Sequence, residues 1–241
     1  MKKIIHGFFF LLVLFVFFIT AVTSAQSITG NGNVIRETRT VSPFNEIESD
    51  GVFNVYISQG SSENIVVEAD DNIVPFITTI SKNNKLKLSS KDEAEIKKST
   101  KLNIYVTVKN IDKINFSGVG DLETEGKLNL TELKIDNSGV GNIKLEIDCD
   151  RLDIENNSVG NINLTGKADN VKIEHNGVGN VKAFDLTANT LKIESNAVGN
   201  AEVNSEKELY MDLNGMGNIT YKGNAVIKSL NKNGLGDIKK L

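Results

Sequence analysis

The chain has 241 residues, of which 39% are hydrophobic and 24% are charged, and it contains only two prolines. This composition excludes a disordered chain, a collagen-like chain and a multi-span membrane protein, and it is typical of one or two compact domains. Lys and Arg number 27 against 31 Asp and Glu, a net charge of −4, so the basic surface of a nucleic-acid-binding protein is missing and we expect no nucleic-acid partner.

Residues 1–25 have the pattern of a secretory signal peptide. Lys2 and Lys3 precede an uncharged apolar run from residue 8 to residue 22, and Thr23-Ser24-Ala25 supplies small residues for cleavage. The alternative is an uncleaved membrane anchor, but fifteen apolar residues fall short of the roughly 20 that span a bilayer. We therefore expect cleavage after Ala25, a mature chain without a transmembrane segment, and export to the periplasm, the outer cell surface or the medium.

Residues 26–112 are irregular and predict an N-terminal cap with degenerate coils. The residues around Val52 match the repeat described below, which indicates a first coil there. Three runs with strand-like composition follow, at residues 65–68, 85–88 and 102–108, and a short helix is expected near residues 72–80. An irregular segment of this kind is what the exposed end of a repeat protein requires.

Residues 113–241 contain one motif seven times, from SGVGD at 117–121 to NGLGD at 233–237. The second glycine of each copy is expected to form a corner where a side chain would clash or where φ is positive. These turn glycines are 18 to 21 residues apart: Gly120, Gly141, Gly160, Gly179, Gly199, Gly217 and Gly236. A period near 19 residues is too short for most two-helix repeats, and it suits a coil of short strands.

Three apolar columns appear when the copies are aligned on the residue between the two glycines, which we call the zero column: Val119, Val140, Val159, Val178, Val198, Met216 and Leu235. The positions five residues before and three residues after it are also apolar in every copy. Between them, apolar and polar residues alternate with period two, as in a strand with one buried face. We therefore predict an all-β fold, a right-handed parallel β-helix (solenoid) with coils of about 19 residues, with all three columns in its core.

The position two residues after the zero column is Asn or Asp in every copy. Asn tolerates left-handed backbone geometry and can form hydrogen bonds along a stack, so this column is expected to be structural. His175 is expected on a coil surface by chance. The single Cys149 has no second thiol for a disulfide or a Cys-based metal site.

Five consecutive coils place a carboxylate four residues before the zero column, and these form the carboxylate column: Asp136, Glu155, Glu174, Glu194 and Asp212. Lysines stand two residues earlier in several coils. One interpretation is a solvated face with weak exposed ion pairs, which also discourages aggregation. The other is a weak binding site for Ca²⁺, which takes oxygen ligands, or for a basic partner.

The stretch Phe44-x-x-Ile47-x-x-x-Gly51, the turn Ile57-x-Gln59-Gly60 and the SGVGD/N repeats resemble the head GIN domain family, described as heads of autotransporter adhesins. The resemblance covers about residues 40 to 238. It implies an exported β-helical domain, and it brings no catalytic motif.

We therefore expect a non-enzymatic exported module, an adhesin or an envelope-binding scaffold, whose partner is a glycan or a protein. One alternative is a carbohydrate-active β-helix enzyme similar to polysaccharide lyases, which would place a carboxylate cluster in a groove beside a basic residue. Another is a purely structural envelope protein without a saturable ligand.

Overall fold

The computed structural model of the protein describes residues 26–91 and 94–241. Over these ranges the chain forms strands and one 3-10 turn, η1 (Val74–Phe76), with no α-helix. The expected signal peptide, residues 1–25, lies outside the described residues. Within the described ranges, no helix has the length and apolar character needed to cross a membrane.

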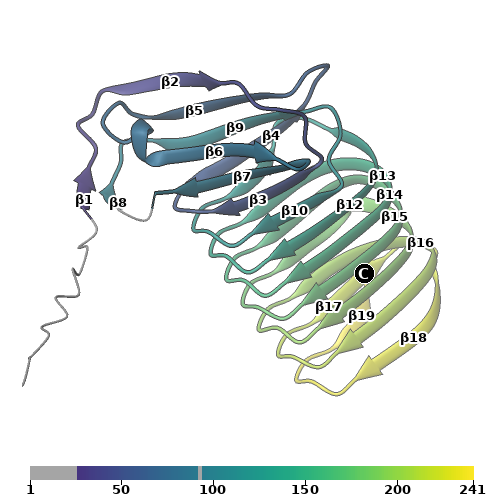
Figure 1. Ribbon diagram of the computed structural model, residues 1–241. Helices are drawn as coiled ribbons and strands as arrows, with labels where there is room; N and C mark the ends of the chain where they lie inside the picture. Colours follow the sequence, from purple (N-terminus) through teal and green to yellow (C-terminus); the bar gives the residue numbers. More distant parts are fainter. Residues whose placement is uncertain (1–25, 92–93) are drawn as a thin grey trace, which may run out of the picture.

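The regular part is a parallel β-solenoid, as the repeat predicts, and its coils stack along one axis (Figure 1). Each strand pairs in parallel with the strand one repeat further on, in the register set by the turn motif: Lys113 opposes Lys134 and Ile135 opposes Ile154. The strands are β10 (Lys113–Phe116), β11 (Leu122–Thr124), β12 (Leu128–Asn137), β13 (Ile143–Asn156), β14 (Ile162–His175), β15 (Val181–Ser195), β16 (Ala201–Leu213), β17 (Ile219–Lys222), β18 (Val226–Lys232) and β19 (Ile238–Lys240).

The turn glycines bring successive coils into close backbone contact. Gly141 has a φ of 146°, and a Cβ on it would lie 1.9 Å from the carbonyl oxygen of Gly120. Any larger residue would separate the coils, which confirms the predicted role of glycine. The Asn and Asp column beside it is also structural, because each side chain from Asp121 to Asn218 accepts a hydrogen bond from the main chain of the next coil, such as Asn161 N to Asn142 Oδ1 at 3.0 Å.

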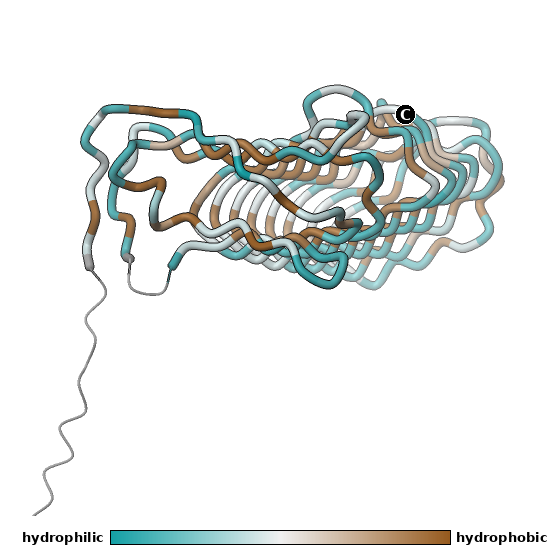
Figure 2. The backbone as a smooth tube through the Cα atoms, turned by 45° about the horizontal axis from the view of Figure 1, so that its top comes forward, coloured by the Kyte–Doolittle hydropathy of each residue, from teal (hydrophilic) through white to brown (hydrophobic). Residues whose placement is uncertain are grey.

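The two apolar columns on either side of the turn are buried in the interior, together with further alternating positions such as Leu145 and Leu152. In the coil around residue 178, Ile173 and Val181 are fully buried. The hydropathy of the chain follows this alternation (Figure 2). At the end of the solenoid the burial is incomplete, since Leu230 of the last coil is 47% exposed.

The zero column is not in the core, so this part of the sequence interpretation is wrong. Its side chains are 47–73% exposed and form a continuous row with Val52, which is 51% exposed. We call this row of eight apolar residues the valine ridge, and parallel bridges join its members from coil to coil. The physical reason is strand parity: the zero position lies an odd number of residues from both buried columns, so its side chain points outward.

His175 is fully buried, which contradicts the expected surface position. It stands in an internal polar ladder in which Asn137 Nδ2 donates to Asn156 Oδ1 at 2.7 Å, and Asn156 Nδ2 lies 3.0 Å from His175 Nδ1. His175 Nε2 lies 3.0 Å from the carbonyl oxygen of Gly179. A neutral ring protonated on Nε2 satisfies both contacts. Burial lowers the pKa of His175 below its usual 6.5, although the Gly179 contact opposes this.

The N-terminal segment forms a mixed-sheet cap on the first coil. Strands β3 (Glu46–Asp50) and β4 (Asn54–Gln59) flank Val52 and pair in parallel with β10 and β11, which confirms the predicted first coil. On their other side lie β7 (Lys85–Ser90) and β9 (Leu102–Val108). Beyond these, antiparallel pairing takes over with β5 (Asn64–Asp70), β2 (Val34–Arg39) and β6 (Ile77–Lys82). A short parallel pair, β1 (Gln26–Thr29) and β8 (Ala94–Lys98), completes the cap.

The helix expected near residues 72–80 is reduced to the single turn η1, followed directly by β6. The β-branched run Ile77-Thr78-Thr79-Ile80 favours a strand, and antiparallel pairing with β7 supplies its hydrogen-bond partners. The three strand-like runs of the cap are confirmed as parts of β5, β7 and β9.

A pair of substitutions in one coil tests the observed parity. Ile173→Asp places an unpaired carboxylate in the core and should lower the free energy of unfolding by at least about 3 kcal/mol. Val178→Asp leaves its carboxylate in water and should cost about 1 kcal/mol or less. Chemical denaturation of residues 26–241 in dilute solution measures both values. Similar losses for the two variants would contradict the exposure of the ridge.

The buried imidazole predicts a pH dependence of stability. Because its folded-state pKa is depressed, the unfolded chain binds a proton that the native state does not, and stability should fall as the pH drops below about 6.5. His175→Asn extends the internal amide ladder without a titrating group. The difference in unfolding free energy between pH 7.5 and pH 5.5 should therefore be smaller in the variant. An unchanged difference would exclude His175 as its source, and residues 26–241 contain no other histidine.

Candidate functional site

The carboxylate column lies in register along one outer face of the solenoid. Asp136 opposes Glu155, Glu155 opposes Glu174, and the series continues through Glu194 to Asp212. Neighbouring carboxylates about 4.8 Å apart repel one another unless cations lie close to them.

Lysines two residues earlier neutralise part of this column. Asp136 lies 3.2 Å from Lys113 Nζ and 3.0 Å from Lys134 Nζ, and Glu174 lies 2.5 Å from Lys172 Nζ. Burial raises the pKa of Asp136, but the hydrogen bonds from Lys134 and Lys113 outweigh it, so the pKa is lowered overall. Asp136 is therefore ionised and paired at neutral pH.

Two other members of the column, Glu155 and Glu194, have amide partners. Glu155 accepts a hydrogen bond from Asn157 Nδ2 at 3.3 Å, and Glu194 accepts one from Asn196 Nδ2 at 3.2 Å. Each coil contributes one carboxylate. Across residues 26–91 and 94–241, no group of three or more His, Cys, Asp and Glu side chains is placed to hold a metal ion. The calcium interpretation stays a prediction.

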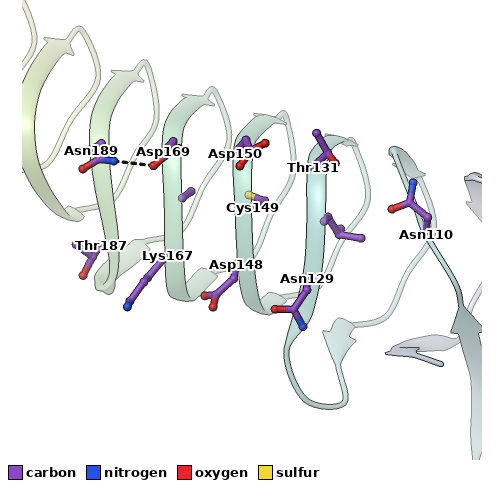
Figure 3. A pocket seen from close by; sticks show the side chains of 12 residues that line it. Asn110, Asn129, Thr131, Asp148, Cys149, Asp150, Lys167, Asp169, Thr187 and Asn189 are labelled. Atoms are coloured by element: carbon purple, nitrogen blue, oxygen red, sulfur yellow. Dashed lines mark hydrogen bonds between the residues drawn. The ribbon is translucent and has the colours of Figure 1, made fainter. Parts of the chain in front are cut away.

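A groove of about 530 Å³ crosses the solenoid at the bend within strands β12 to β15 (Figure 3). Two rows of outward side chains border it. One row is Asn129, Asp148, Lys167 and Thr187, and the other is Thr131, Asp150, Asp169 and Asn189. Between the rows the chain carries Leu130, Cys149 and Ala168, and the small side chains among these leave the hollow open.

The polar groups of the groove are mostly free to meet a ligand. Asp150 and Asp169 are exposed, and Asn189 Nδ2 donates to Asp169 Oδ1 at 2.6 Å (Figure 3). Asp148 is partly buried and forms an ion pair with Lys127 at 3.1 Å. The walls therefore offer carboxylate, amide and hydroxyl groups in rows that run across four coils.

Cys149 lies on the floor of this groove. Burial and then the nearby Asp150 raise the pKa of its thiol to about 12. The thiol is therefore protonated at neutral pH and is a poor nucleophile. The arrangement favours holding a ligand over covalent chemistry.

A lyase would need a carboxylate cluster beside a basic residue in a groove. This groove contains those residue types, because Asp148, Asp150 and Asp169 line it together with Lys167. Its environment differs from that of a catalytic centre. Lys167, Asp150 and Asp169 are exposed, whereas a catalytic base needs a site that excludes water and shifts its pKa.

Sequence reasoning missed this groove, although its signal is present in the repeat. Asn-Leu-Thr at 129–131, Asp-Cys-Asp at 148–150, Lys-Ala-Asp at 167–169 and Thr-Ala-Asn at 187–189 are polar–apolar–polar triplets at matching places in successive coils. The triplets predict two polar rows. The bend that opens a groove between them is a property of the folded coil.

Comparison with known proteins identifies the family. The family described as "Putative auto-transporter adhesin, head GIN domain" matches residues 43–225, and the chain belongs to it. A putative adhesin from Bacteroides fragilis is similar in structure, with a TM-score of 0.85 and 33% identity, over 89% of this chain and 100% of that chain.

Two further structures share the fold alone. A putative lipid binding protein from Parabacteroides distasonis has a TM-score of 0.72 and 22% identity, over 90% of this chain and 100% of that one. A putative adhesin from Parabacteroides merdae has a TM-score of 0.64 and 24% identity, over 90% and 100% of the two chains. Among curated proteins, none matches this chain.

Replacing Glu155, Glu174 and Glu194 together with Gln tests the carboxylate column. Because exposed ion pairs contribute little, the triple variant should stay within about 1 kcal/mol of the parent in unfolding free energy. The melting temperature of the parent should also be the same with millimolar Ca²⁺ as with EDTA. A calcium-dependent rise in melting temperature that the triple variant loses would establish a metal site instead.

Proposed function

We propose that this member of the head GIN domain family is an exported, non-enzymatic binding module that holds a neutral glycan chain in the groove of strands β12 to β15. The family description and the adhesin name of the structure with 33% identity support a binding role. The pattern of residues 1–25 supports export.

The observation that carries this proposal is the pair of polar rows that border the groove. Rows of carboxylate, amide and hydroxyl groups recur at the coil spacing of about 4.8 Å, so they match a polymer whose hydroxyl groups also recur along its length. A groove that crosses four coils and is open to solvent suits an extended chain better than a small enclosed metabolite.

The charges of the groove select the ligand class. Three aspartates against one lysine give it a net negative charge, which disfavours an acidic polysaccharide. Carboxylate oxygens accept hydrogen bonds from sugar hydroxyl groups, and hydrogen bonds to charged groups contribute about 1.5–3 kcal/mol each. No Trp, Tyr or Phe lines the groove, so hydrogen bonds and the small apolar floor must supply the affinity.

A glycan array with purified residues 26–241 tests the proposal, followed by calorimetry on a neutral glycan that binds. Replacing both Asp150 and Asp169 with Ala removes the two exposed carboxylates and should weaken that binding at least about tenfold. The double variant should keep its melting temperature, since both side chains are exposed.

Replacement of Glu155 and Glu174 with Gln is the matched control, because it removes two carboxylates from another face and should leave the affinity unchanged. Absence of any bound neutral glycan, or equal affinity for the Asp150 and Asp169 variant, would refute the groove as a glycan site. Release of unsaturated sugar products would support the lyase alternative instead.

A further inference from the structure

The valine ridge is an exposed apolar stripe that neither the fold nor the proposed glycan site uses. Its eight side chains run along the tight corners that follow β3, β10, β12 to β16 and β18. Main-chain hydrogen bonds between coils satisfy the backbone beneath it, as in Val140 N to the Gly118 carbonyl oxygen at 2.9 Å. A contiguous apolar patch of this kind marks an interaction surface.

Amide ladders border the ridge on both sides and leave its centre without charge. On one side Asn176 Nδ2 donates to Asn157 Oδ1 at 2.9 Å, and Asn196 Nδ2 donates to Asn176 Oδ1 at 2.8 Å. The other side is the Asn and Asp column described above. Charged residues occur in these three columns only toward the ends of the stack, at Asp50, Asp121 and Asp237.

We propose that the valine ridge is the interface of a homodimer, in which the ridges of two copies pack side by side. The ridge and its two borders comprise 24 residues, three columns over eight coils. This number matches the roughly 20–30 residues per partner of a stable protein–protein interface. Two copies also share the same coil spacing, so an apolar side chain meets its counterpart at every coil.

The physical cost of this contact is low. Valine has few rotamers to lose, and the bordering amides already form hydrogen bonds with one another, so little side-chain entropy is lost on association. In the central coils, the ridge and its two bordering columns carry no charge that would repel the partner. A partner with an unrelated surface lacks the matching period.

Charge selects the relative orientation of the two copies. The carboxylate column lies on one side of the ridge. The column on the other side holds Lys144, Lys182 and Lys239 together with Glu123 and Glu202. A two-fold axis parallel to the solenoid places Asp136 and Glu174 on the side of the partner's Lys144 and Lys182, so each carboxylate column faces a column of mixed charge. An antiparallel pair places two carboxylate columns on the same side, where they repel. The dimer is therefore parallel, and each residue of the ridge faces its own copy.

Sedimentation of residues 26–241 over about 1 to 500 µM tests the interface. The parent should show a concentration-dependent dimer, and the double change Val159→Asp and Val178→Asp should raise the dissociation constant at least about a hundredfold. Thermal unfolding of the same variant checks that it is folded. The control Lys207→Asp, at an exposed position outside the ridge, its borders and the two charged columns beside them, should still form a dimer. A parent that stays monomeric throughout, or a dimer that survives the double change, would overturn the proposal.

Cross-linking tests the orientation. A chain with Val159→Cys and Cys149→Ala should form a disulfide-linked dimer with itself on oxidation, because the parallel arrangement brings the two copies of position 159 together. An antiparallel pair would instead cross-link an equimolar mixture of the Val159→Cys and Val178→Cys chains, each also carrying Cys149→Ala. That second pattern would overturn the parallel arrangement.

Discussion

The structure depends on the close backbone approach of successive coils at the turn glycines. A carbonyl oxygen of one coil occupies the space that a Cβ of the next would need, as Gly160 shows against Gly141 at 1.9 Å. This approach lets the main chain on both sides of the corner form parallel hydrogen bonds without a break, such as Gly120 N to the Val140 carbonyl oxygen at 2.9 Å. It fixes the register of every strand that follows.

A fixed register turns each position of the repeat into a column. Inside, the columns become an apolar core and a short polar ladder of Asn137, Asn156 and His175. Outside, they become charged, amide and apolar stripes that run the length of the solenoid. Because one position of the motif recurs at every coil, it produces a whole column of similar side chains. A few positions of the motif therefore set the surface chemistry of the protein.

The motif predicts the fold because its two signals are local. Glycine spacing gives the coil length, and alternation gives the strands and their buried faces. The same alternation also predicts that the zero column is exposed and that His175 is buried. His175 lies an even number of residues from the buried Ile173 and Val181, whereas Val178 lies an odd number from both. The expectation that every apolar column lies in the core was therefore wrong for the zero column. The helix expected before residue 80 was wrong because pairing with β7 decides the structure of that segment.

The candidate site was less predictable than the fold. The register of the carboxylate column followed from the repeat, and its ion pairs with lysines two residues earlier followed from the side-chain period. The groove depends on the bend within β12 to β15 and on the small Cys149 and Ala168 between the two polar rows. A bend arises from the packing of a whole coil, and the composition of one triplet does not reveal it.

A repeating surface also determines which ligands it distinguishes. One coil offers a ligand only a few hydrogen bonds or one valine contact, which is too little for stable binding against the loss of rotational and translational freedom. A ligand with its own regular repeat engages successive coils after the first contact, and each further contact is intramolecular, at a high effective concentration. Affinity then rises with the number of coils spanned. Such a surface discriminates by length and period more than by the detail of any single site, which is why we propose a polymer and a second copy of the chain as partners.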